Sequence, residues 1–155
     1  MTLFGTLRAP RELTFGAGQR RSLGTIAAKL GTRALVVTDA RLANDAELQA
    51  MVAQLEGAGI ATRVDGSTPP DVPVEAALAS AAAARDFAPD LTRGFRGGSC
   101  MDMAKCVAVL LTDRGTPQDY FGEYKVPGPV MPLIAIPTTA GTGSEVTPVA
   151  VLSDT

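Results

Sequence analysis

The sequence alternates between short apolar runs and longer segments in which apolar residues recur every three or four positions. One such segment places Leu23, Ile26, Ala27 and Leu30 on one face of a helix. Strand followed by helix, repeated, is typical of βαβ units. We therefore predict an α/β fold, a doubly wound and mainly parallel sheet with helices on both faces. The predicted strands are residues 34–37, 60–64, 91–94, 133–136 and 149–152, and further helices are expected from about 44 to 57, 73 to 85 and 99 to 110.

The length of 155 residues corresponds to about one domain, and no linker or internal repeat divides the sequence. We therefore expect residues 1–155 to form a single domain. Residues 3–7 and 12–15 flank Pro10 and are predicted to form a small N-terminal β-hairpin ahead of the first helix.

Charge and targeting signals exclude several classes of protein. The chain carries 14 basic and 16 acidic residues, a net charge of −2, so it has no basic surplus to hold a nucleic acid backbone. It shows neither a secretory signal nor an apolar stretch of membrane-spanning length, which predicts a cytoplasmic protein without a membrane segment. Cys100 and Cys106 are too far apart along a helix for a disulfide and are expected to be core thiols.

Histidine is absent from the whole sequence. A reaction that needs an imidazole base, or a metal site rich in histidine, therefore cannot be assembled from these residues alone.

A glycine-rich turn follows the predicted strand 91–94 and opens a helix. Gly97 and Gly98 would let the backbone approach a ligand, and the free N–H groups of the helix start would favour a pyrophosphate. Ser99 is placed to cap the helix, with Asp102 three residues later as in a capping box. The alternative reading is an ordinary capped turn without a ligand.

A second turn of this kind follows the predicted strand 133–136. It carries Thr138, Thr139, Gly141 and Thr142, which combine hydroxyl donors with permissive glycine and suit a ligand that bears phosphate or ribose. Asp39 follows the first predicted strand, where a carboxylate can accept ribose hydroxyls. Both features could also be simple caps of the segments that follow them.

Four segments together resemble one known family, the iron-containing (group III) alcohol dehydrogenases. Gly97, Gly98 and Ser99, with Asp102 and Lys105, resemble the family motif GGGSxxDxAK. Residues 137–147 are similar to the motif PTTAGTGSEVT, residues 15–18 to an early FGxG turn, and residues 36–39 to the strand that bears the ribose-binding aspartate. The four matches occur in the family's order and cover essentially the whole chain.

The resemblance implies the Rossmann-like, NAD(P)-binding N-terminal domain of such an enzyme. Asp39 would bind the adenosine ribose, and its charge would repel a 2′-phosphate, which favours NAD over NADP. Asp71 occupies a position that is often polar on the adenine side. The remaining roles implied are pyrophosphate binding by Gly97, Gly98 and Ser99, a place near the nicotinamide for Asp102, and lining of the cofactor cleft by Thr138, Thr139, Gly141 and Thr142.

Family members are more than twice as long, and their metal ligands, an aspartate and three histidines, lie in a C-terminal helical domain. We therefore expect the cofactor-binding part of an NAD(P)- and metal-dependent alcohol dehydrogenase, truncated and inactive alone, with no catalytic residue and no iron or other metal ligand in this chain. The alternative is a non-catalytic nucleotide-binding or assembly module. Such a module could complement a separate C-terminal half or form a homodimer through the early hairpin.

Two arginines depart from the family pattern. Arg96 replaces the first glycine of GGGS, which costs about 1–2 kcal/mol if its φ is positive. The strand that enters this motif is normally apolar in the family but contains Arg93 here, and an unpaired arginine in a sheet covered on both faces costs several kcal/mol. We therefore expect a weakly stable chain.

Overall fold

The computed structural model describes residues 8–113 and 115–154, which form a four-stranded sheet with helices packed on it. The strands run in the order β2-β1-β3-β4, and all pairs are parallel. The elements in chain order are η1 (Gln19–Ser22), α1 (Leu23–Ala27), β1 (Arg33–Val37), α2 (Ala46–Gly57), β2 (Ala61–Asp65), α3 (Val74–Ala84), β3 (Leu91–Phe95), α4 (Gly98–Thr112), η2 (Pro117–Tyr120) and β4 (Leu133–Ile136).

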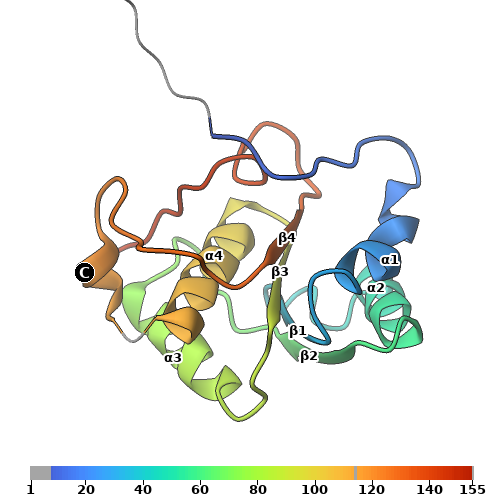
Figure 1. The fold of residues 1–155 in the computed structure, drawn as a ribbon, viewed down its shortest axis with the longest axis horizontal. Coiled ribbons are helices and arrows are strands. Elements are labelled where there is room, and N and C mark those ends of the chain that lie inside the picture. The colour runs from blue at the N-terminus through green and yellow to red at the C-terminus, as the bar shows by residue number, and fades with distance from the viewer. Residues whose placement is uncertain (1–7, 114, 155) are drawn as a thin grey trace, which may run out of the picture.

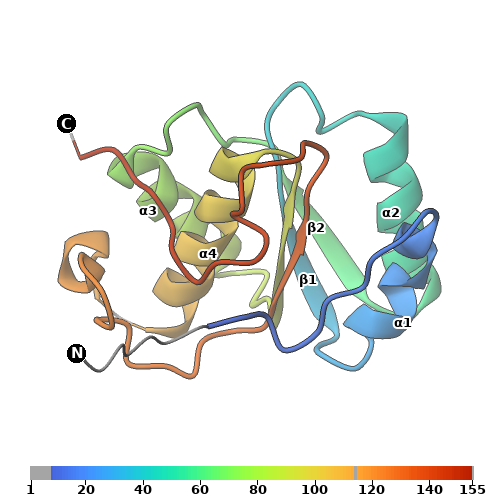
Figure 2. The same ribbon diagram turned by 90° about the horizontal axis from the view of Figure 1, so that it is seen from above.

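The helices form a layer on each face of the sheet. Figure 2 shows α1 and α2 on one side and α3 and α4 on the other, with the strands between them. Along β1, Ala34 and Val36 belong to the core under α1 and α2, whereas Leu35 and Val37 belong to the core under α3 and α4. This alternation confirms the predicted doubly wound, Rossmann-like α/β fold.

Two aspartates fix the ends of these elements. Asp45 is the N-cap of α2, and its carboxylate accepts hydrogen bonds from the backbone of Glu47 and Leu48. Asp90 accepts hydrogen bonds from the backbone N–H groups of Thr32 and Arg33, which ties the start of β1 to the turn before β3.

Two predicted strands differ from the structure. Residues 12–15 are exposed and form no strand, because no neighbouring segment pairs with them among the described residues, so this half of the predicted hairpin is wrong. Its other half, residues 3–7, lies outside the described residues. The predicted strand 149–152 is also wrong, because this segment lies outside the sheet. Its neighbour Ser153 forms a single parallel bridge with Pro73, and the Val149 and Val151 side chains are exposed.

The Arg93 side chain is fully buried between β3 and α2. Its Nη2 lies 2.7 Å from the sulfur of Met51, and the guanidinium lies 5.3 Å from the centre of the Phe95 ring. Its Nε and Nη1 have no hydrogen-bond partner. Burial lowers the pKa of the guanidinium to about 9, and the expectation of an unpaired charge in the sheet is therefore confirmed.

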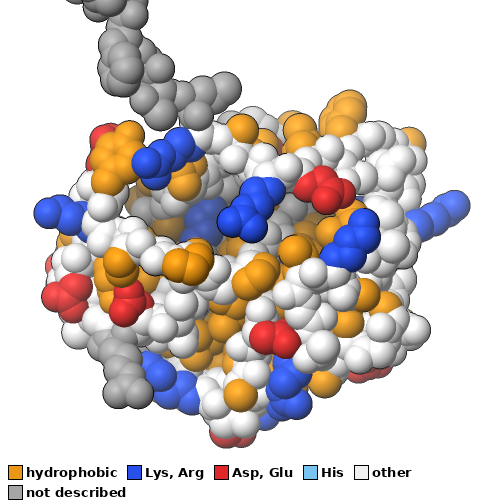
Figure 3. Space-filling model, in the orientation of Figure 1, with side chains coloured by type: hydrophobic (Ala, Val, Ile, Leu, Met, Phe, Trp, Pro, Cys, Tyr) orange, Lys and Arg blue, Asp and Glu red, His pale blue; other side chains and the backbone are white. Residues whose placement is uncertain are grey.

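The surface mixes charged and apolar groups. On the face shown in Figure 3, basic and acidic side chains are scattered, and apolar side chains gather over β4 and the chain that leads to it (compare Figure 1). In the described part of the chain, none of the helices has both the length and the apolar character needed to cross a bilayer.

Candidate functional site

The candidate site lies where the strand order reverses direction. The chain moves from β1 outward to β2, and from β3 outward to β4, so β1 and β3 are neighbours at the centre of the sheet. Open α/β sheets bind ligands in the crevice beyond the carboxyl ends of two such strands. Asp39 follows β1, and the glycine-rich turn follows β3, so both predicted features lie at this crevice.

The turn after β3 leads directly into α4. Gly97 is the N-cap residue in an extended conformation, with φ −71° and ψ 178°, and no side chain caps the helix. The predicted cap by Ser99 is wrong, because the helix begins at Gly98 and places Ser99 inside its first turn. A glycine N-cap leaves the first-turn N–H groups to other acceptors, and the helix dipole makes this end favourable for an anion.

The space in front of this turn is open. A Cβ added at Gly97 would meet no atom within 4 Å, and a Cβ added at Gly98 would meet only Thr142 Cβ, at 4.0 Å. Each glycine has a conformation that alanine can also adopt. The turn is therefore a cradle that side chains would fill, which fits a ligand that needs close backbone approach.

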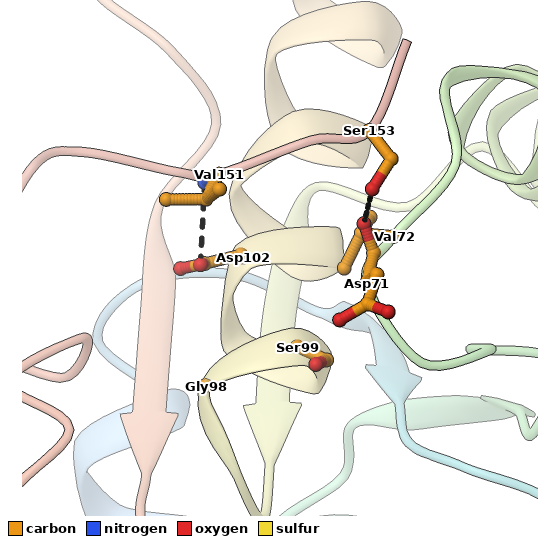
Figure 4. Close-up of a pocket in the computed structure, with 7 residues that line it drawn as sticks. All are labelled: Asp71, Val72, Gly98, Ser99, Asp102, Val151 and Ser153. Atoms are coloured by element: carbon orange, nitrogen blue, oxygen red, sulfur yellow. Dashed lines mark hydrogen bonds between the residues drawn. The ribbon is translucent and has the colours of Figure 1, made fainter. Parts of the chain in front are cut away.

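A cavity of about 280 Å³ adjoins the start of α4. Figure 4 shows the Ser99 side chain on α4 pointing toward the segment before α3, whereas the Asp102 side chain points the other way, toward Val151 of the C-terminal segment. The lining therefore brings together three regions that are far apart in the sequence. It consists of Asp71, Val72, Gly98, Ser99, Asp102, Val151 and Ser153.

The wall of this cavity formed by Asp71 and Val72 has a strained backbone. Both residues have positive φ, 60° and 43°, although neither is glycine and Val72 is β-branched. Ser153 holds this segment, because its hydroxyl donates to the Asp71 carbonyl at 2.7 Å and its backbone bonds Val72 and Val74. Such strain is concentrated at ligand sites in folded proteins. Asp71 lies in one cavity with Ser99 and Asp102.

Asp102 is the centre of a polar cluster that sequence reasoning missed. Its carboxylate accepts hydrogen bonds from Ser144 Oγ at 2.5 Å, from Lys105 Nζ at 3.2 Å and from the backbone N–H of Val151 at 3.2 Å. Lys105 Nζ also donates to Ser144 Oγ and to the Val149 carbonyl. The cluster fastens residues 144–151 to α4. The only signal for it in the sequence is the presence of Lys105 and Ser144 within the two motifs.

The second glycine-rich turn lies beside the first. A Cβ added at Gly98 would meet Thr142, whose hydroxyl donates to Glu145 at 3.3 Å. Thr138, Thr139 and Gly141 are exposed on the same turn, and Gly141 needs its left-handed φ of 94°. The structure therefore brings the two turns together, although none of Thr138, Thr139, Gly141 and Thr142 lines the cavity itself.

Asp39 is not among the residues that line the cavity, and it lies between two arginines. Its carboxylate is 3.3 Å from Arg41 Nη2 and 3.7 Å from Arg96 Nη1. Partial burial raises the pKa of this carboxyl, but hydrogen bonds from Arg41 and the two positive charges outweigh burial, so its pKa is lowered and it stays ionised. Arg96 has a φ of 101°, which confirms the strained backbone expected for an arginine in place of glycine.

The described residues include no cluster of metal ligands, and both cysteines are buried. Within the described residues, no three His, Cys, Asp or Glu side chains are placed to hold a metal ion. Cys100 and Cys106 are buried and free, and burial raises their pKa values to about 11 and about 12. Thiols of this kind are poor nucleophiles.

The parallel sheet and the cradle at its switch point define a Rossmann-like domain. The sequence model of one family, described as iron-containing alcohol dehydrogenase, matches residues 10–155. The chain therefore belongs to the iron-containing alcohol dehydrogenase family, whose members are oxidoreductases that use NAD(P) and a metal.

Two curated relatives illustrate the match. The sulfoacetaldehyde reductase of Bilophila wadsworthia is 37% identical over 125 residues, which cover 81% of this chain and 32% of the relative. The long-chain-alcohol dehydrogenase 1 of Geobacillus thermodenitrificans is 38% identical over 122 residues, which cover 77% of this chain and 31% of the relative. This chain thus spans about a third of each relative's length.

Solved structures agree with this assignment. A 1,3-propanediol oxidoreductase superposes with a TM-score of 0.94 at 29% identity, over 99% of this chain and 40% of that chain. An alcohol dehydrogenase from Oenococcus oeni gives a TM-score of 0.91 at 27% identity, over 96% of this chain and 40% of that chain. The fold therefore matches the N-terminal domain of these enzymes.

Proposed function

We propose that this chain binds a nicotinamide dinucleotide, NAD or NADP, along the carboxyl edge of its sheet. The observation that carries the proposal is the uncapped start of α4, with open space before Gly97 and Gly98 and the second glycine-rich turn beside it. The pyrophosphate would lie against Gly97, Gly98 and Ser99, where N–H donors and the helix dipole favour negative charge.

The other predicted residues have roles consistent with this placement. Asp39, at the end of β1, would lie at the adenosine ribose. Asp102 lines the cavity beside the cradle, and it would face the nicotinamide end of the ligand. Four residues of the second turn would form the opposite wall of the cleft: Thr138, Thr139, Gly141 and Thr142.

In the family, the dinucleotide accepts or donates a hydride while a divalent metal polarises the substrate oxygen. The proposed substrate class is an alcohol and its aldehyde or ketone, which agrees with relatives named as a sulfoacetaldehyde reductase and a long-chain-alcohol dehydrogenase. These 155 residues contain no histidine, so they do not fit the family's metal site. We therefore propose that the chain by itself binds the dinucleotide without turning over alcohols.

The test is calorimetric titration of the chain with NAD and NADP, compared with its Gly98→Ala variant. Alanine suits the helical backbone of Gly98 and meets only Thr142 Cβ at 4.0 Å, so the fold is expected to keep its stability. The added methyl group would stand where the pyrophosphate approaches, and we expect affinity to fall at least tenfold.

Gly57→Ala is the matched control. Gly57 ends α2 far from the cradle, and a Cβ there also meets no atom within 4 Å. This variant is expected to bind like the wild type. A folded wild-type chain that binds neither dinucleotide, or unchanged binding by Gly98→Ala, would contradict the proposal.

A further inference from the structure

Two arginines surround the Asp39 carboxylate. Arg41 approaches from the same loop, with its backbone N–H at 2.9 Å from one carboxylate oxygen and its Nη2 at 3.3 Å from the other. Arg96 approaches from the end of β3, with Nη1 at 3.7 Å. Two positive charges thus face the single negative charge of Asp39.

The three side chains differ in how much they are exposed. The Asp39 side chain is only 14% exposed, whereas those of Arg96 and Arg41 are 34% and 79% exposed. The carboxylate is therefore partly covered by its partners, and the guanidinium groups are what a ligand in solution meets first. At 3.7 Å the Arg96 contact is an ion pair without a close hydrogen bond, so its donors remain able to bind a stronger acceptor.

The position of Arg96 links this charge to the cradle. It directly precedes Gly97, the N-cap residue of α4, and its side chain reaches across the switch point from β3 to the residue that follows β1. A dinucleotide with its pyrophosphate on the cradle and its adenosine ribose at Asp39 would therefore place the ribose next to Arg96.

We propose that Arg96, assisted by Arg41, binds a phosphate on the ribose 2′-oxygen, so that the chain prefers NADP to NAD. The expectation of NAD considered the charge of Asp39 alone, whereas here that charge is compensated by two guanidinium groups. An arginine fork matches the geometry of a phosphate and binds it through paired N–H donors. This inference rests on the proposed function, because it uses the pyrophosphate cradle to locate the ribose.

The test is calorimetric titration of the wild type and of Arg96→Gly with NADP and with NAD. Glycine suits the left-handed φ at residue 96, so this variant is expected to fold at least as stably as the wild type, as circular dichroism melting can verify. We expect the wild type to bind NADP at least tenfold more tightly than NAD. Arg96→Gly should lose at least tenfold in NADP affinity and change its NAD affinity by less than threefold.

Two further variants test whether the effect is specific to Arg96. Arg41→Gln should weaken NADP binding by about threefold only, because this side chain is mostly in solvent. Arg21→Gln removes an exposed arginine of η1 and should leave both affinities unchanged. Preference of the wild type for NAD, or equal loss of both ligands in Arg96→Gly, would overturn the inference while leaving dinucleotide binding intact. Failure of the folded wild type to bind either ligand would overturn both proposals.

Discussion

Replacing Arg93 by methionine is expected to stabilise the protein. Methionine keeps the unbranched apolar stem of the side chain and removes a guanidinium whose Nε and Nη1 have no partner. Burial, and to a smaller extent the charge of Arg20, lowers the pKa of this group from 12.5 to about 9. At about 1.4 kcal/mol per pKa unit, keeping the charge inside costs on the order of 5 kcal/mol.

Part of that gain is offset by lost interactions. The guanidinium contacts the Phe95 ring at 5.3 Å, and a contact of this kind contributes about 1–2 kcal/mol when desolvated. We therefore expect the free energy of unfolding to rise by about 2–4 kcal/mol, in the range found when buried ions are replaced by apolar residues. For a chain of this size, the melting temperature would rise by about 5–15 °C.

Urea unfolding followed by circular dichroism at pH 7 measures the difference. Because the folded-state pKa of Arg93 is lower than its unfolded value, the destabilisation is complete below about pH 9 and fades as the pH rises through that value. The advantage of Arg93→Met should therefore shrink between about pH 9 and pH 10.5. Arg21→Met, at an exposed position, is the control and should change stability by less than about 0.5 kcal/mol. A variant no more stable than the wild type at pH 7 would refute the reasoning.

Three other predictions follow from packing and hydrogen bonding. Asp90→Asn should lower the free energy of unfolding by about 1–3 kcal/mol in urea at pH 7, because the Asp90 carboxylate accepts hydrogen bonds from Thr32 and Arg33 at 2.7–2.9 Å. Burial raises the pKa of Asp90, but these hydrogen bonds outweigh burial and lower it. The wild-type advantage is therefore present above about pH 4 and should decline as the pH falls through the lowered pKa; an advantage that grows on acidification would contradict this. Gly94→Ala should lower the free energy of unfolding by about 1–3 kcal/mol in the same assay, because the added Cβ would lie 2.8 Å from Met101 Cα. Unchanged stability would disprove the close packing of β3 on α4. Cys100 and Cys106, whose pKa values burial raises to about 11 and about 12, should resist a thiol reagent at pH 8 until urea unfolds the chain, and rapid native-state labelling would show that they are accessible.

Hydrophobic periodicity was sufficient to predict most of the fold. The strand predicted at 133–136 has the same bounds as β4. The predicted bounds of β1 and β3 differ by one residue at one end, and those of β2 are shifted by one residue at both ends. These segments were predictable because buried parallel strands are apolar throughout and are separated by amphipathic helices. Residues 149–152 have the same composition but lie outside the sheet, because their backbone is held by Asp102 and by the neighbouring bridge at Pro73.

The location of the candidate site was also predictable, because both glycine-rich turns follow strands and parallel strands end at one edge of the sheet. The hydrogen-bond and ion-pair partners of the side chains could not be predicted from the sequence. The capping-box pattern of Ser99 and Asp102 is local, whereas the actual partners of Asp102 include Ser144 and Val151, which tertiary packing brings to α4. The ion pair between Arg96 and Asp39 likewise depends on the pairing of β1 with β3.

The parallel sheet also has a consequence for how the chain folds. Neighbouring strands of the sheet are separated in the sequence by at least one helix. Between β1 and its partner β3, the sequence contains α2, β2 and α3. Contacts of this kind close long loops before they gain stabilising energy, so they form slowly. During refolding from denaturant, the helical circular dichroism signal should therefore appear early and the sheet should form late. In the interval, the unpaired edges of the apolar strands would be exposed, and the chains could associate with one another through them.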